Sequence, residues 1–175
     1  MTTLYNNTDR FKEAYLAEFP GYYSAGDAGL SDEEGYIHIL ERTDDAINVA
    51  GHRISTGLLE EAVLSHHRVP ECAVIGANDD LKGVVPVCLF VSTGSPSSAE
   101  LEQISKEIIA TVREKVGAVA AMRTALPVDA LPKTRSGKIL RNVIRKIANG
   151  EEYKLPGTIE DASVVDKIVG VLRKD

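Results

Sequence analysis

Regular patterns of hydrophobic positions begin only after residue 45 of this 175-residue chain. The segment AINVAGHRI, residues 46–54, predicts two short strands around a Gly-containing turn. The next segment predicts a helix that Thr56 caps. Its apolar face consists of Leu58, Leu59, Ala62 and Val63. The runs ECAVIGA (71–77) and VPVCLFVS (85–92) are apolar and rich in β-branched residues, so they predict two strands joined by a turn.

The second half of the chain predicts further helices and one more strand. Five apolar residues recur at helical spacing before Gly117: Leu101, Ile104, Ile108, Ile109 and Val112. TALPVDAL (124–131) predicts a strand, ILRNVIRKIANG (139–150) predicts a short helix, and SVVDKIVGVLRK (163–174) is amphipathic. Because strands and helices alternate irregularly, the pattern predicts an α+β fold in which a short, mostly antiparallel sheet packs with helices.

The first part of the chain, to about Arg42, has a different pattern. Several glycines and acids surround short β-type runs such as residues 36–40, which predicts hairpin strands with tight turns. Too few apolar residues lie here to close a core. We therefore expect this part to be the edge of a larger sheet that the chain lacks.

Composition narrows the class of protein. A hydrophobic content of 43% and a charged content of 26% are typical of a soluble globular protein, and no apolar run approaches the roughly 20 residues that span a membrane. The N-terminus has no apolar signal segment, so the expected location is the cytoplasm, or the mitochondrial matrix if a transit peptide lies upstream. The net charge of −6 argues against a general nucleic-acid binder. Cys72 and Cys88 lie in apolar runs, which predicts buried, reduced thiols and no zinc site.

One basic stretch contrasts with this acidic balance. The segment LPKTRSGKILRNVIRK, residues 131–146, contains six cations and no acid: Lys133, Arg135, Lys138, Arg141, Arg145 and Lys146. It is not a P-loop, because no Gly lies five residues before Gly137 and Ile139 stands where a Ser or Thr would hold magnesium. A nucleic-acid patch would need interleaved aromatic residues. A solvated basic face, the usual explanation of a charge run, remains open on this stretch alone.

Three motifs together point to a family. PKTRSGKILR (132–141), ERTDDAINVAGHRI (41–54) and GYYSAGDAG (21–29) resemble, in order and spacing, motifs of the adenylate-forming acyl-CoA synthetases. The resemblance covers nearly the whole chain and is closest to the short-chain branch, most of all to propionate–CoA ligases, with acetyl-CoA synthetases as near neighbours. It implies that residues 1–43 are the C-terminal edge of a large AMP-binding domain and residues 44–45 a hinge. Residues 46–150 would then be the mobile C-terminal catalytic domain, and residues 151–175 a tail.

The resemblance also implies a chemistry and its residues. Enzymes of this family convert a short-chain carboxylate and ATP to an acyl-adenylate and pyrophosphate, and CoA then displaces AMP. Lys138 matches the catalytic lysine, and the nucleotide-binding positions match Asp27, Arg42 and Arg53. Asp44 matches the hinge residue, and Gly51 the turn that lines the CoA tunnel. Magnesium would travel with ATP and the missing domain, so we expect no metal held by this chain.

The sequence is compatible with three functions. The first is a fragment of a propionate- or acetate–CoA ligase, inactive until the missing N-terminal domain is supplied. The second is a free-standing module that binds nucleotide or CoA or acts in regulation, without catalysis. The third is a lysine-acylation target, with an acyltransferase or deacylase acting on Lys138. None of them involves a nucleic acid or a membrane.

Overall fold

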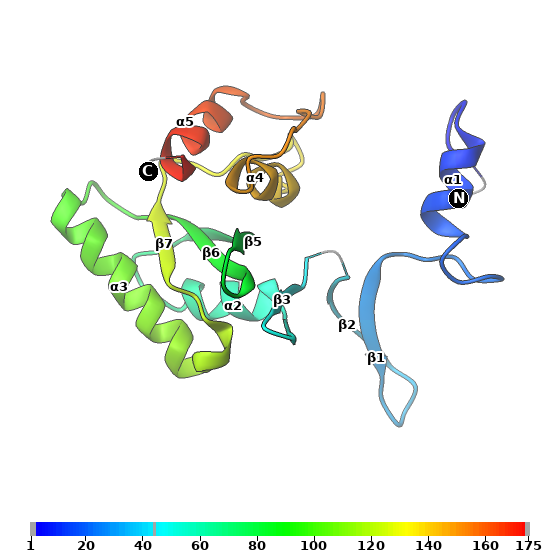
Figure 1. The fold of residues 1–175 in the computed structure, drawn as a ribbon, viewed down its shortest axis with the longest axis horizontal. Coiled ribbons are helices and arrows are strands. Elements are labelled where there is room, and N and C mark those ends of the chain that lie inside the picture. The colour runs from blue at the N-terminus through cyan, green and yellow to red at the C-terminus, as the bar shows by residue number, and fades with distance from the viewer. Residues whose placement is uncertain (1–2, 44, 174–175) are drawn as a thin grey trace. The chain divides into compact units, whose positions relative to one another are not determined.

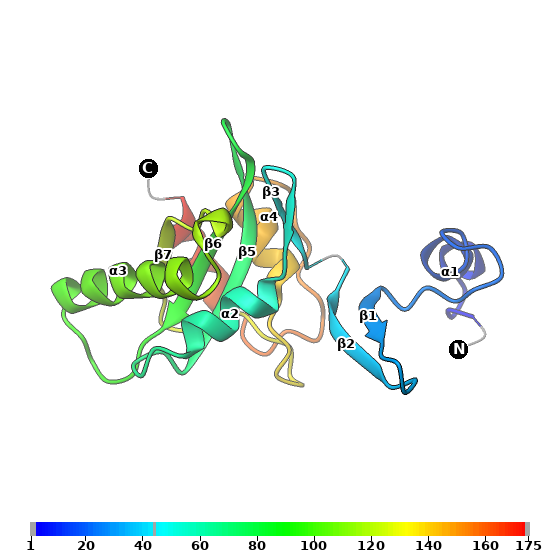
Figure 2. The ribbon, with the colours of Figure 1, turned by 90° about the horizontal axis from the view of Figure 1, so that it is seen from below.

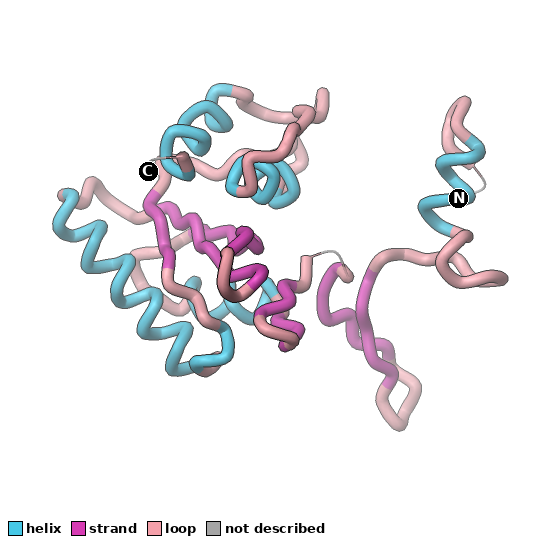
Figure 3. Tube along the Cα trace, in the orientation of Figure 1, coloured by secondary structure: helices cyan, strands magenta, loops and turns pink. Residues whose placement is uncertain are grey.

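The computed structural model describes residues 3–43 and 45–173, and the chain forms two compact units, residues 1–45 and 46–175. The first unit contains helix α1 (Thr8–Tyr15) and an antiparallel hairpin of β1 (Asp27–Ser31) and β2 (Ile37–Arg42), drawn as a pair of strands in Figure 3. The sequence patterns did not predict α1. Its N-cap is Asn7, whose side chain accepts the Arg10 amide hydrogen at 3.2 Å.

The first unit buries little of its apolar surface. Among its described residues, Phe11 is the only buried hydrophobic side chain. Of the side chains that the structure describes in this unit, nine large hydrophobic ones are exposed instead: Tyr5, Leu16, Phe19, Tyr22, Tyr23, Leu30, Tyr36, Ile37 and Ile39. So much exposed apolar surface on a small unit is typical of a face that another structure covers.

The second unit is built on a three-stranded sheet. Strands β5 (Glu71–Asp79) and β6 (Gly83–Val91) pair antiparallel, and β7 (Thr124–Pro127) pairs parallel to β6 on its other side. The connection from β6 to β7 runs through α3 (Ser98–Lys115) and a short 3-10 helix, η1 (Ala118–Ala120). The mostly antiparallel sheet and its helices confirm the predicted α+β class.

Alternation along β5 and β6 gives the sheet two apolar faces. Cys72 and Val74 of β5, with Cys88 and Phe90 of β6, face the first core. Ala73 and Ile75 face the second core on the other side of the sheet. Helices α2 (Thr56–Leu64) and α3 cover the first face, whereas α4 (Arg141–Ala148) and α5 (Ser163–Leu172) cover the second, as Figures 1 and 2 show. The sheet is therefore the middle layer of three.

Several predicted element boundaries were wrong, among them the following two. Helix α2 is capped by Ser55, whose hydroxyl accepts the Leu58 amide hydrogen at 3.4 Å, and Thr56 is its first helical residue. The strand predicted over 124–131 ends at Pro127. Val128 donates one further bond to Phe90 before the chain leaves the sheet.

The two cysteines are buried, as predicted, and form no disulfide in the structure. A hydrogen bond with Cys72, together with burial, raises the pKa of the Cys88 thiol well above its usual value. None of the helices in the described residues is long and apolar enough to cross a lipid bilayer. In the same residues, no group of three or more His, Cys, Asp or Glu side chains could hold a metal ion.

The burial contrast between the units predicts different local stabilities. We expect amide hydrogens of the β1–β2 hairpin to exchange faster than those of β5 and β6, because the hairpin lacks a buried core that would hold it closed. Hydrogen exchange followed by mass spectrometry on the intact chain measures this difference. Equal protection in both units would contradict it.

Candidate functional site

The basic motif folds into a tight main-chain loop, residues 133–139, which we call the lysine turn. Lys133 and Ile139 form an antiparallel bridge at its base. Thr134 closes the loop, because its amide donates to Lys138 O at 2.8 Å and its carbonyl accepts the Gly137 amide hydrogen at 2.8 Å. The Thr134 hydroxyl also accepts the Lys138 amide hydrogen at 3.2 Å. Hydrogen bonds within the turn therefore fix the backbone of Lys138.

The side chain of Lys138 points to solvent from this turn. Arg135, Ser136, Gly137 and Lys138 are all exposed, and within the described residues the Lys138 ammonium makes no ion pair with a carboxylate. Gly137 has a φ of +82°, a conformation that side chains with a Cβ rarely adopt, so a glycine is required to close the loop before Lys138. An exposed ammonium on a closed turn is suited to meet an anion from outside the unit.

Both ends of the lysine turn are tied to the core by ion pairs. On one side Lys133 pairs with Glu71 at the start of β5. On the other side Arg141, the first residue of α4, donates from Nε and Nη2 to the two carboxylate oxygens of Glu60 at 2.9 and 2.7 Å. Glu60 also accepts the Val74 amide hydrogen at 2.9 Å, and its side chain is only 13% exposed. One carboxylate therefore joins α2, β5 and the helix that follows Lys138.

Gly51 lies on the turn, and Arg53 on the second strand, of the hairpin formed by β3 (Ile47–Val49) and β4 (His52–Ile54). The two residues of this turn, Ala50 and Gly51, have φ values of +48° and +86°. Positive φ at both positions is typical of the type I′ turn that suits a two-residue hairpin. A Cβ built on Gly51 meets no atom within 4 Å, so the space beside this glycine is open. Arg53 is exposed on β4.

Asp27 and Arg42 lie in the first unit, directly opposite each other across the β1–β2 hairpin. Their side chains approach to 3.6 Å, and both are partly exposed. Arg42 also donates to Ala25 O at 3.1 Å. The structure therefore brings together these two candidate nucleotide-binding residues, while Gly51, Arg53 and Lys138 belong to the second unit. Asp44, the candidate hinge residue, lies outside the described residues.

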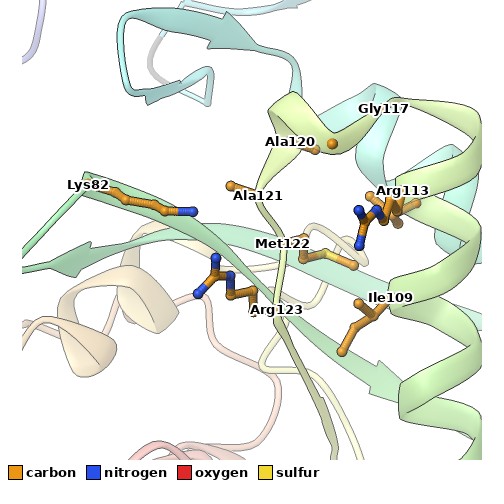
Figure 4. A pocket seen from close by; sticks show the side chains of 10 residues that line it. Lys82, Ile109, Arg113, Gly117, Ala120, Ala121, Met122 and Arg123 are labelled. Atoms are coloured by element: carbon orange, nitrogen blue, oxygen red, sulfur yellow. The ribbon is translucent and has the colours of Figure 1, made fainter.

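A pocket of about 260 Å³ adds cations that the sequence analysis did not single out. Three basic side chains line it, each from a different element: Lys82 from the β5–β6 turn, Arg113 from α3 and Arg123 from the segment before β7. Figure 4 shows Lys82 and Arg123 reaching toward one another, with Arg113 beyond Met122. The other lining residues are Ile109, Val112, Gly117, Ala118, Ala120, Ala121 and Met122. With no acid in its lining, the pocket suits an anionic group.

The turn that carries Lys82 is itself held by a carboxylate. The Lys82 and Leu81 amides donate to Asp79 Oδ1 at 2.8 and 3.0 Å, and these bonds lower the pKa of Asp79. Lys82, Arg113 and Arg123 are far apart in the sequence, and only the fold brings them to one pocket. The sequence gives little indication of this pocket, because the three cations belong to no recognisable motif.

The arrangement as a whole presents cations to solvent. Lys138 is an exposed point charge on a hydrogen-bonded turn, and the pocket holds three more positive groups around an apolar wall. Such groups bind and stabilise phosphates and other oxyanions.

Comparison with known proteins identifies the second unit. Residues 58–138 match the family model of the AMP-binding enzyme C-terminal domain, and this range ends at Lys138. The chain contains the C-terminal domain of an AMP-binding enzyme. This confirms the family predicted from the three motifs.

The relatives are short-chain acyl-CoA synthetases that match nearly all of the chain. Acyl-CoA synthetase short-chain family member B, mitochondrial, of Dictyostelium discoideum is 51% identical over 95% of the chain. Acyl-CoA synthetase short-chain family member 3, mitochondrial, of Mus musculus is 50% identical over 98%. Acetyl-coenzyme A synthetase 1 of Debaryomyces hansenii is 45% identical over 97%. The chain spans only 24%, 25% and 26% of these three proteins, respectively.

Solved structures show the same fold in this part of larger enzymes. An ATP-bound RpMatB-BxBclM chimera superposes with a TM-score of 0.69 at 26% identity, over 82% of this chain and 28% of that one. The anthranilate CoA ligase AuaEII, solved with anthranoyl-AMP, has a TM-score of 0.61 at 32% identity, over 75% of this chain and 25% of that one. Both matches place the chain within the adenylate-forming fold.

Because Glu60 joins three elements, we expect its replacement to destabilise the fold. Replacing Glu60 with Ala should lower the free energy of unfolding of the chain by about 3 kcal/mol, because Arg141 and the Val74 amide both lose a partly buried partner. Urea denaturation followed by circular dichroism measures the change. Glu61→Ala is the matched control, since Glu61 is the exposed neighbour on the same helix. Equal effects of the two substitutions would show that the Glu60 contacts add no stability.

Proposed function

We propose that this chain is the C-terminal part of an ATP-dependent short-chain fatty acid–CoA ligase that uses propionate or acetate. The observation that carries the proposal is the exposed Lys138 ammonium on a closed turn, within a domain of the AMP-binding enzyme family. The remaining part of the enzyme, a large N-terminal AMP-binding domain, would hold the acyl group and Mg²⁺ with ATP. The cytoplasm is the proposed location, with the mitochondrial matrix as the alternative because two of the relatives are named as mitochondrial.

Lys138 would act in the first half-reaction. The substrate carboxylate attacks the α-phosphate of ATP, pyrophosphate leaves, and negative charge shifts between oxygens that must approach one another. A fixed cation beside the carboxylate and the α-phosphate lowers this barrier electrostatically. A lysine suits the role because its ammonium is a compact charge on a long stem. The hydrogen bonds of Thr134 to the main chain of residues 137 and 138 hold the base of that stem.

The remaining candidate residues would bind the nucleotide and CoA. We propose that Asp27 receives the ribose hydroxyls, since a carboxylate can accept two hydrogen bonds side by side. Arg42, opposite Asp27 in the hairpin, and Arg53 on β4 would approach phosphate. In the second half-reaction the CoA thiol attacks the acyl carbonyl and AMP leaves. Gly51 would line the thiol's route, and the open space beside it supports this assignment.

The pocket of Lys82, Arg113 and Arg123 is the best candidate for the CoA phosphates in this chain. It shares no residue with the lysine turn, so it suits a phosphate group other than the one at the reacting centre. Asp44 is proposed as the hinge. The division of the chain into compact units at residues 45–46 supports a hinge there, because a few torsions between two units can exchange their orientations.

A chimera tests the proposed function. In it this chain replaces the matched C-terminal residues of the mouse relative, so that the large domain is supplied in one polypeptide. The chimera should form propionyl- or acetyl-CoA from ATP, CoA and the acid, and this chain alone should form none. The binding-module alternative instead requires that the isolated chain bind CoA or AMP, which calorimetry would detect. The acylation-target alternative requires transfer of an acyl group to Lys138 without any thioester product from the chimera.

Substitution of Lys138 separates the two half-reactions. In the chimera, Lys138→Ala should slow acyl-adenylate formation by about 10²–10³-fold, because a preorganised charge at the first transition state is lost. Thioester formation from supplied acyl-adenylate should change little. Pyrophosphate exchange measures the first step, and acyl-CoA from pure adenylate measures the second. Lys146→Ala is the control, since Lys146 belongs to the same basic run but donates to Glu152 O. Equal slowing of both steps would contradict the assigned role of Lys138.

Gly51 should show the opposite selectivity. Gly51→Leu in the chimera should slow the thioester step by about tenfold or more and spare adenylation, because its side chain would fill the open space beside the turn. The positive φ of Gly51 adds strain, which Gly94→Leu imposes at an equivalent loop glycine with a φ of +76° and open space. If both variants slow thioester formation alike, strain alone explains the effect and the tunnel assignment fails.

A further inference from the structure

We propose that residues 158–160, here called the tail strand, position the lysine turn and with it Lys138. The tail strand follows α4 in the chain and lies outside residues 58–138, the range that matches the family domain. The proposal rests on the proposed function, since it concerns the delivery of the candidate catalytic lysine. It assigns these residues a positioning role and no contact with substrate.

The tail strand pairs with the lysine turn through main-chain hydrogen bonds. The Arg135 amide donates to Thr158 O at 2.9 Å, and the Glu160 amide donates to Lys133 O at 2.9 Å. The two bonds flank an antiparallel bridge between Thr134 and Ile159. This is the pattern of one step of an antiparallel ladder.

The same segment of the turn is paired on its other edge. There the Thr134 amide donates to Lys138 O, and the Leu140 amide donates to Pro132 O, both at 2.8 Å. Residues 133–135 are therefore the middle of a miniature three-stranded arrangement, with residues 138–140 on one side and the tail strand on the other. A hairpin of two short strands is only marginally stable alone, and a third strand is what makes such a unit persist.

The tail strand is itself fixed to the second core. Ile159 is partly buried against that core, and in the following helix Val165 and Ile168 are almost completely buried. The Asp161 carboxylate accepts the amide hydrogen of Ser163, the first residue of α5, at 2.8 Å, and interactions with Ser163 lower the pKa of Asp161. The tail strand thus connects the lysine turn to a helix that is anchored on the sheet by buried side chains.

A segment that merely covered the core would act through its side chains. The side chains of Thr158 and Glu160 are exposed, whereas their main-chain groups make both bonds to the turn. Removing the Glu160 side chain should therefore have no effect, and removing its amide hydrogen should loosen the turn. A loosened turn should also slow the reaction, because a displacement of about 1 Å at a reacting group can lower the rate by as much as 10²-fold.

The first test compares Glu160→Pro with Glu160→Ala in the 175-residue chain. Proline has no amide hydrogen, so only the first variant loses the bond to Lys133 O. Amide exchange measured by NMR should accelerate by about tenfold at Thr134 and Gly137 in the proline variant and stay unchanged in the alanine variant. Amides of β5 and β6 report on the fold as a whole. Equal exchange at the turn in both variants would overturn the proposal, as would equal acceleration in β5, β6 and the turn.

The second test places both variants in the chimera. Glu160→Pro should slow acyl-adenylate formation by about tenfold relative to Glu160→Ala and leave thioester formation from supplied adenylate unchanged. A loosened turn with an unchanged adenylation rate would overturn the positioning role. If the chimera with the unsubstituted chain forms no acyl-adenylate, the proposed function fails, and the exchange comparison still decides whether the tail strand holds the turn.

Discussion

The antiparallel ladder between β5 and β6 is the interaction on which the second unit depends. Its pairing runs without a break from Glu71–Val91 to Asp79–Gly83. Because the ladder fixes the alternation of side chains, it divides the apolar residues between two cores and thereby decides which helices pack on which face. A slip of one residue would exchange the two faces of β5. The lysine turn and the cationic pocket are attached to elements that this division has already placed.

Glu60 connects the sheet to the helix that follows the lysine turn. The Val74 amide at the edge of β5 and the guanidinium that begins α4 share its carboxylate, so the helix after Lys138 is oriented by the sheet itself. Charge-assisted, bidentate bonds of this kind are strong and directional. Lys138 and Arg141 are only three positions apart in the sequence but have different roles. One is available to a ligand, and the other holds the scaffold.

The sequence predicted those parts of the molecule that local periodicity determines. Strands β5 and β6 and helix α3 follow directly from their apolar patterns, and the three motifs led to the family. Helix α1 was missed because a surface helix with one buried residue, Phe11, leaves almost no apolar stripe. The cap of α2 was placed one residue late, since Ser55 and Thr56 are equally good caps by type and only geometry separates them. The pocket of Lys82, Arg113 and Arg123 and the pairing of residues 133–135 with the tail strand depend on contacts between distant segments, which no local pattern encodes.

The order of the strands in the miniature arrangement has a consequence for synthesis. Residues 138–140 and 133–135 leave the ribosome together, but the third strand follows only after α4 and the loop beyond it have been made. A chain released before residue 160 would contain every residue of the family domain and still lack the Glu160 bond to the turn. On the proposed role of the tail strand, the geometry around Lys138 is completed only once residue 160 has been made, so a polypeptide that stops before it does not present its lysine in the finished form.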